Sequence, residues 1–184
     1  MQLIQALEYA LTYLGDEDPT VTVAATMHPD RKLSLLLQCA NMVRKEIAFE
    51  YLPLVATETV EHTQDAFSYD ALSHRVLRIL QVQDANRGIR LRFRMHPDRC
   101  EVPASAGKLV VQYQYQPEDI SFTDDCGLPP SVTARTLALG IAAEYCLIQG
   151  MYEQSVLFSD RFADDMRSAS RRVGEARVKP RRWQ

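Results

Sequence analysis

Histidines and carboxylates are the side chains best able to do chemistry in this chain, but their spacing does not group them. The histidines are His28, His62, His74 and His96, and no two lie four residues apart or form an HxH pair, the spacings that zinc sites commonly use. Each lies in or beside a polar segment. We therefore interpret all four as solvated surface residues.

Adjacent acids could serve acid–base or metal chemistry if folding made them converge. They occur at Asp16-Glu17-Asp18, Asp124-Asp125 and Asp164-Asp165. Neighbouring side chains on a helix point in different directions, so no pair converges by itself. The chain also contains no GxSxG, no phosphate-binding glycine loop and no dinucleotide fingerprint. We predict that it is not an enzyme and holds neither a cofactor nor a metal.

The four cysteines are scattered along the chain without a CxxC pair, so they resemble neither a zinc knuckle nor a redox motif. We interpret them as small buried residues of a protein in a reducing compartment. They are Cys39, Cys100, Cys126 and Cys146.

The pentapeptide Met-His-Pro-Asp-Arg occurs twice, at residues 27–31 and 95–99. Its His-Pro-Asp triplet is also found in J-domain co-chaperones, but there it joins two packed helices, whereas here the first copy opens a helix and the second leaves a strand. Proline followed by aspartate gives a rigid turn with a side-chain acceptor. We therefore predict a helix N-cap at Asp30 and a turn at Asp98.

The composition is that of a globular protein, with 46% hydrophobic and 24% charged residues over 184 positions. No apolar run approaches the roughly 20 residues of a membrane span. The first residues carry neither a basic leader nor a small-residue cleavage site. We expect no membrane insertion and no signal-peptide export.

Charge is distributed unevenly. The last eighteen residues, Arg167 to Gln184, hold seven basic residues and one acid, which leaves 14 basic and 23 acidic residues in the rest of the chain. The only tryptophan, Trp183, lies in this basic segment. A tryptophan beside arginines is typical of interface anchors, so we predict an extended interaction arm at residues 175–184.

Helical periodicity marks four segments: residues 2–14, 30–51, 132–148 and 152–173. In the last of these the predicted apolar face is Val156, Phe158, Phe162, Met166, Ala169 and Val173. The residues between the first two helices are expected to form a loop.

From about residue 53 to 117 the period changes to two, which predicts strands. Candidates are residues 57–63, 76–83, 89–95 and 111–115, with a hairpin turn at residues 84–88. In the third candidate, Arg90, Arg92 and Arg94 alternate with apolar residues. Three guanidiniums in a row could follow phosphates, but they also suit a solvent-facing strand that contacts acids on a neighbouring subunit.

The predicted fold is α+β and mainly α: a four-helix bundle with an inserted small antiparallel sheet and an extended basic arm. We assign residues 1–52 to the N-terminal helices, 53–118 to the β-rich insertion, 119–174 to the C-terminal helices and 175–184 to the arm.

Several segments in this order resemble the head-to-tail connector, or adaptor, proteins of tailed bacteriophages and prophages. They are LTYLG (11–15), EIAFEYLP (46–53), LPPSVTARTLALGIAAEYC (128–146), FSDRFADDMRSASRRV (158–173) and the arginine-rich end. The long β insertion departs from the smaller siphovirus-type connectors and is closer to the larger podovirus-type adaptors.

The resemblance implies a structural virion protein that binds the portal as a dodecameric ring, extends the DNA channel and forms the platform for the tail. Its partners would be the portal, a downstream tail or nozzle protein, further copies of itself, and double-stranded DNA passing transiently through the channel. It would be assembled in the host cytoplasm and reside at the head-to-tail interface of the virion. The portal contact would fall on Arg172, Arg177, Lys179, Arg181, Arg182 and Trp183, and the neighbour or tail contact on Arg90, Arg92 and Arg94. The alternative is a nucleic-acid-binding protein that uses the basic arm.

Overall fold

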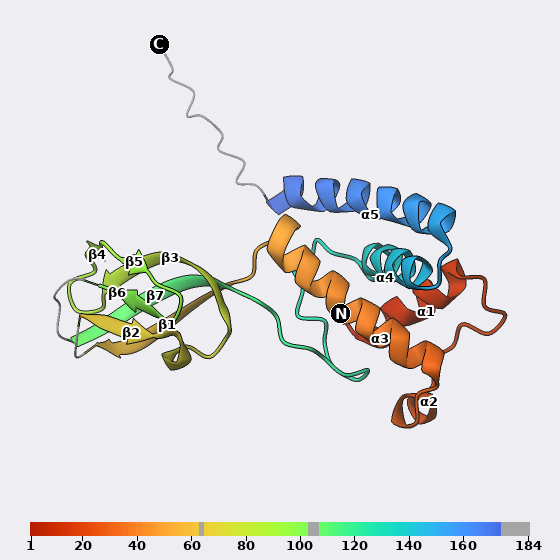
Figure 1. Cartoon of the computed structure of the whole chain (residues 1–184), viewed down its shortest axis with the longest axis horizontal. Helices are drawn as coiled ribbons and strands as arrows, with labels where there is room; N and C mark the ends of the chain where they lie inside the picture. The colour runs from red at the N-terminus through yellow and green to blue at the C-terminus, as the bar shows by residue number, and fades with distance from the viewer. Residues whose placement is uncertain (63–64, 103–106, 174–184) are drawn as a thin grey trace, which may run out of the picture. The chain divides into compact units, whose positions relative to one another are not determined.

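The computed structural model describes residues 1–62, 65–102 and 107–173 (Figure 1). Internal contacts divide the chain into two units, which we call the helical unit (Met1–Arg44 and Ile120–Gln184) and the β unit (Lys45–Asp119). The described residues form five α-helices and seven strands, and 45% of these residues are helical and 23% are in strands.

The predicted fold class, a mainly α four-helix bundle with a small inserted sheet, is therefore wrong. The β unit contains two antiparallel sheets, ordered β1-β7-β3-β4 and β2-β6-β5, and has a core of its own. The second sheet escaped prediction because its strands have only two or three residues, too few to display a period. These strands are β2 (Ala66–Ser68), β5 (Arg94–Met95) and β6 (Arg99–Glu101).

The four predicted helices are confirmed, and a fifth, short one lies in the expected loop. They are α1 (Leu3–Tyr13), α2 (Val23–Met27), α3 (Arg31–Glu46), α4 (Ala134–Ile148) and α5 (Tyr152–Val173). The N-cap predicted at Asp30 is present, because its Oδ1 accepts from the Leu33 backbone N–H at 2.7 Å. No helix in the described part of the chain is both long and apolar enough to span a bilayer.

Helix α4 is the centre of the helical unit. Ten of its fifteen residues are buried, and it packs against both α1 and α5. Gly140 sits where α4 meets two other helices: a Cβ built there would lie 2.6 Å from Val43 Cγ1 on α3 and 3.1 Å from Phe162 Cε2 on α5. Only glycine lets the three helices approach this closely.

The buried face of α5 is formed by Ser155, Phe158, Phe162, Met166 and Ala169. The prediction of Val156 on this face is wrong, because Val156 is 60% exposed. Ser155 takes the inward position instead, and its Oγ donates to the Ala143 carbonyl of α4 at 3.0 Å. Side-chain polarity alone would predict a buried Val156 and an exposed Ser155.

The main sheet of the β unit consists of β1 (Val55–His62), β3 (Val76–Asp84), β4 (Arg90–Leu91) and β7 (Gly107–Tyr115). The strand predicted at residues 111–115 is confirmed but begins earlier, at Gly107. On its predicted apolar face Val111 and Tyr113 are buried, and Tyr115 is partly buried. The predicted hairpin is confirmed too: the Asp84 N–H donates to the Ile89 carbonyl at 3.0 Å, and β3 pairs with β4.

The predicted strand at residues 89–95 is broken in two. Its first part, β4, pairs with β3, whereas its second part, β5, pairs with β6 in the other sheet. Leu91 and Phe93 still pack against the apolar core of the β unit, while Ile89 and Met95 are exposed. The chain thus passes from the first sheet to the second at Arg92 and Phe93. Of the four apolar residues predicted on one face, only the middle two lie against the core.

Candidate functional site

The residues predicted to contact a portal lie mostly outside the described residues. Arg177, Lys179, Arg181, Arg182 and Trp183 belong to the segment after α5. Arg172 falls in the last turn of α5.

The three alternating arginines of the β unit are exposed but do not form one row. Arg90 lies on β4 and Arg94 on β5, the edge strands of two different sheets, and Arg92 lies between the two strands. Arg94 is opposite Glu101 in the register of β5 and β6. Cations on edge strands oppose pairing with another sheet edge, so this placement fits the solvent-facing interpretation.

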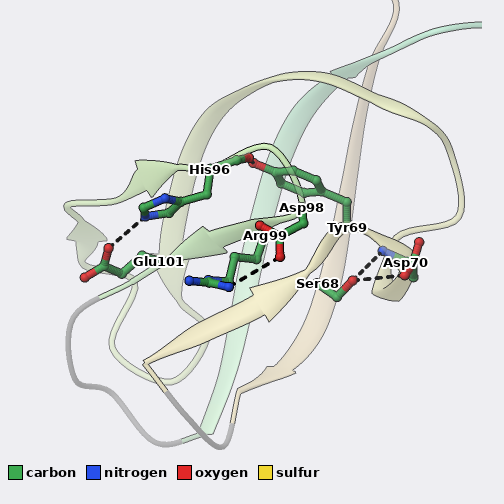
Figure 2. A network of polar contacts seen from close by, with 7 residues as sticks. All are labelled: Ser68, Tyr69, Asp70, His96, Asp98, Arg99 and Glu101. Carbon is green, nitrogen blue, oxygen red and sulfur yellow. Dashed lines mark hydrogen bonds and ion pairs between the residues drawn. The ribbon is translucent and has the colours of Figure 1, made fainter.

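Figure 2 shows the polar network of the second sheet. His96 Nε2 lies 3.0 Å from Glu101 Oε2, and the Tyr69 hydroxyl donates to the His96 carbonyl at 2.8 Å. The His96 N–H donates to the Arg99 carbonyl at 2.9 Å and closes the β5–β6 hairpin. The turn predicted at Asp98 is therefore confirmed.

The electrostatics of this network stabilise the ionised carboxylate. The hydrogen bond from His96, with Arg94 and Arg99 nearby, lowers the pKa of Glu101. His96 keeps 29% of its side chain exposed, as expected of a surface residue, but it also has Glu101 as a hydrogen-bond partner, which the sequence did not predict. In Figure 2 Ser68 contacts Asp70, not His96, so the drawn residues form no Ser–His–acid relay.

A second polar cluster was not foreseen from the sequence. Glu58 lies on the core-facing side of β1, where its carboxylate accepts from the Ser73 N–H and hydroxyl at 3.0 Å each and from the Tyr113 hydroxyl. Burial raises the pKa of Glu58, but these hydrogen bonds outweigh it and the net pKa is lowered. Burial and the bond to Glu58 raise the pKa of Tyr113 to about 12.

The same cluster holds a histidine. The His74 ring is half-buried and stacks on Tyr115 with a centroid distance of 4.3 Å, a contact that the sequence did not predict. Glu58 fixes the loop at residue 73 to the sheet and accepts three hydrogen bonds. One feature of the sequence could have predicted this cluster. Glu58 is two residues before Val60 on β1, so its side chain lies on the same face of the strand as a buried valine.

The helical unit contains a cleft of about 590 Å³ lined by charged side chains. Tyr13 accepts a hydrogen bond from Arg135, which raises the pKa of that arginine. Asp164 pairs with Arg167, and Asp165 accepts from the Thr136 hydroxyl at 3.3 Å. Both carboxylates therefore have partners, and neither is arranged as a general base.

Metal binding finds no support among the described residues, where no three histidine, cysteine, aspartate or glutamate side chains group together. All four cysteines are buried thiols, as predicted. Burial raises the pKa of Cys39 and of Cys100 to about 11 each, which keeps both thiols protonated at neutral pH.

The turn between α4 and α5 exposes a group of large apolar side chains, which we call the apolar corner. Tyr152 is 67% exposed, and four further residues are between 48% and 60% exposed. These residues lie within eleven consecutive positions around Gly150. Its members are Leu147, Ile148, Tyr152, Val156 and Leu157.

Comparison with known proteins gives no assignment. No protein-family model matches the chain, and no curated protein matches its sequence.

Proposed function

We propose that this chain is a structural subunit that works by assembling with copies of itself and with a larger particle. The apolar corner carries this proposal. Exposed large apolar side chains that lie close together along the chain favour an interaction site, because each gains free energy when a partner removes it from water. Their mixture of aliphatic residues with a tyrosine suits a protein interface.

We propose that the partner that covers the apolar corner is a second copy of the chain. The first half of α5 carries Glu153, Asp160 and Arg161, whereas its last turns carry Arg167, which pairs with Asp164, and Arg171. A head-to-tail contact between copies can bring the basic end of one α5 toward the acidic end of the next. Such a heterologous contact generates a ring when its rotation closes.

The larger particle that we propose is a tailed-phage head, with the chain as its head-to-tail connector. The resemblance of the helical segments to connector proteins supports this choice. In that role, the ring binds the portal through the basic arm, extends the DNA channel and forms the platform for the tail. Many weak arm contacts act together, because each bound copy raises the effective concentration of the next.

Substitution of the corner tests this proposal. Leu157→Glu places a charge on an exposed position and should leave folding intact while it weakens copy-to-copy contact. Ile89→Glu is the control, because Ile89 is 57% exposed but lies in the β unit. Mass photometry of each protein mixed with the portal should show multi-copy complexes for the unchanged protein and the control only. Equal complexes with Leu157→Glu would refute the role of the corner.

Nucleic-acid binding is the second candidate, favoured by the exposure of Arg90, Arg92 and Arg94. It predicts an affinity for DNA that falls steeply with salt, because each phosphate contact releases counterions. Replacing all three arginines with glutamine should then reduce both the affinity and its salt dependence. An affinity unchanged by these substitutions would exclude this surface as the DNA contact.

A further inference from the structure

The cleft of about 590 Å³ in the helical unit, which we call the Arg135 cleft, is lined by two arginines from two helices. Arg135 lies in the first turn of α4, and Arg161 lies in the middle of α5. Both residues are exposed, and no carboxylate in the described part of the chain forms an ion pair with either guanidinium. The cleft therefore presents two guanidiniums to a ligand.

The two acids that also line the Arg135 cleft already have partners. Asp164 pairs with Arg167 at 2.5 Å, and Asp165 accepts from the Thr136 hydroxyl at 3.3 Å. Two arginines against two aspartates, one of which Arg167 neutralises, leave one excess positive charge at the cleft. A ligand group with a single negative charge therefore suits the cleft better than a dianion such as phosphate, which the aspartates would repel.

A tyrosine holds Arg135 in place. The Tyr13 hydroxyl accepts a hydrogen bond from the Arg135 guanidinium, and this bond, with a smaller effect of the Asp165 charge, raises the pKa of the arginine. The Tyr13 ring in turn contacts the Phe158 ring of α5, with a centroid distance of 6.0 Å. A guanidinium carries five N–H donors, so the bond to Tyr13 leaves others for a ligand.

The Arg135 cleft also has an apolar side. Leu139 lies four residues after Arg135 and so on the same face of α4, and the Tyr13 ring adds aromatic surface. A guanidinium can bind a carboxylate through two parallel hydrogen bonds. The volume lies within the ~300–1,000 Å³ range of ligand pockets, which leaves room for more than the carboxylate itself. We propose that the Arg135 cleft binds a carboxylate carried on an apolar body, with its oxygens on the two guanidiniums and its body against Tyr13 and Leu139.

This binding does not depend on the assembly proposed above, because the Arg135 cleft shares no residue with the apolar corner or with the arm at residues 175–184. The carboxylate can come from a small organic acid or from an acidic residue of a polypeptide with apolar neighbours. Both sources offer the same chemistry to the cleft, so the experiment includes a probe for each.

Nuclear magnetic resonance of the isotope-labelled full-length protein tests the proposal, with hydrocinnamate as the first probe. The probe should shift the backbone signals of residues 133–139 and 161–165 selectively. Hydrocinnamamide, which has the same size without the charge, and inorganic phosphate should each bind about tenfold more weakly or worse. The second probe is a capped tripeptide with glutamate between two phenylalanines. Tighter binding of the tripeptide than of hydrocinnamate would indicate a polypeptide source, and weaker binding would indicate a small acid.

Substitution of the arginines locates the site. Arg135→Gln and Arg161→Gln should each weaken hydrocinnamate binding about threefold to tenfold, because each removes charge-assisted hydrogen bonds at a partly solvated position. Arg171→Gln is the matched control, because Arg171 is an exposed arginine of α5 that does not line the cleft. It should leave the affinity unchanged, and circular dichroism should be the same for all three variants.

Four results would overturn the proposal. The first is the absence of shifts at every soluble concentration of both probes, and the second is a set of shifts outside the Arg135 cleft. The third is binding of hydrocinnamamide or phosphate as tight as that of hydrocinnamate. The fourth is an equal loss of affinity in the cleft variants and in Arg171→Gln.

Discussion

Gly140→Ala is expected to destabilise the helical unit, although alanine is the better helix former. Replacing a helical glycine with alanine favours the helix by about 1 kcal/mol. At this position, however, the new Cβ would meet Val43 Cγ1 at 2.6 Å and Phe162 ring atoms at 3.1 and 3.2 Å. Overpacking of a filled core costs about 1–3 kcal/mol. Subtracting the gain in helix propensity leaves an expected net loss of up to about 2 kcal/mol.

A double-mutant cycle with Val43→Ala isolates the cause. Val43 is fully buried, so its truncation alone should cost about 2 kcal/mol through the cavity that it leaves. In the double variant the methyl group introduced by Gly140→Ala occupies part of that space. The combined loss should be smaller than the sum of the two single losses by at least about 0.5 kcal/mol.

Urea unfolding followed by far-ultraviolet circular dichroism measures these free energies, because the helical signal reports mainly on the helical unit. Ser168→Ala, at an exposed position of α5, is the control for helix propensity and should stabilise slightly. If Gly140→Ala stabilises the protein by about 1 kcal/mol, or if the two substitutions are additive, the close packing of α3, α4 and α5 at this point is refuted.

Three further substitutions test other contacts by the same measurement. Glu58→Gln should cost about 1 kcal/mol at pH 7. Because folding lowers the pKa of Glu58 below 4.5, its contribution is complete above pH 4.5 and is lost as the pH falls through the folded pKa. The cost should therefore shrink at about pH 3, and a cost independent of pH would contradict this role. Arg44→Met should cost about 1–3 kcal/mol, because the buried Arg44 Nε donates to the Cys126 carbonyl at 2.8 Å. Asp30→Ala should cost about 1 kcal/mol by removing the N-cap of α3, whereas Asp30→Asn should be nearly neutral; equal losses for the two would indicate another cause.

Long periodic segments were predictable from the sequence because many residues in each of them follow the same spacing of apolar side chains. The stripe of α1 and the alternation on β7 both continue for at least two full repeats. Helix α1 was placed to within a residue at each end, whereas β7 begins four residues before its predicted start. Two local turns were also predictable: Asp30 caps α3 through the Leu33 N–H, and the hairpin at Asp98 is closed by a backbone hydrogen bond between His96 and Arg99.

Features fixed by tertiary contacts were not predictable. The strand expected at residues 89–95 divides between two sheets because β3 and β6 each pair with only part of it. Ser155 is buried instead of Val156 because a carbonyl of α4 accepts its hydroxyl. The Glu58 cluster joins β1, β7 and the loop at Ser73, which no local pattern brings together.

Among the candidate surfaces, the sequence pointed to the arginines and the basic arm but not to the apolar corner. The sequence analysis assigned Val156 to a buried face. It therefore did not predict that Val156, like Tyr152 and Leu157, is exposed. An apolar residue that a partner covers looks the same in sequence as one that a core covers. Only the position of α5 against α4 separates the two cases.

Native mass spectrometry of the protein, alone and mixed with the portal protein of the same phage or prophage, tests the proposed connector role most directly. We predict a complex of the portal with a ring of copies, formed by the full chain and lost on deletion of residues 175–184. The deleted form should keep the circular dichroism of the full chain. A monomer that ignores the portal but binds DNA in a salt-dependent way would contradict the connector role and favour nucleic-acid binding.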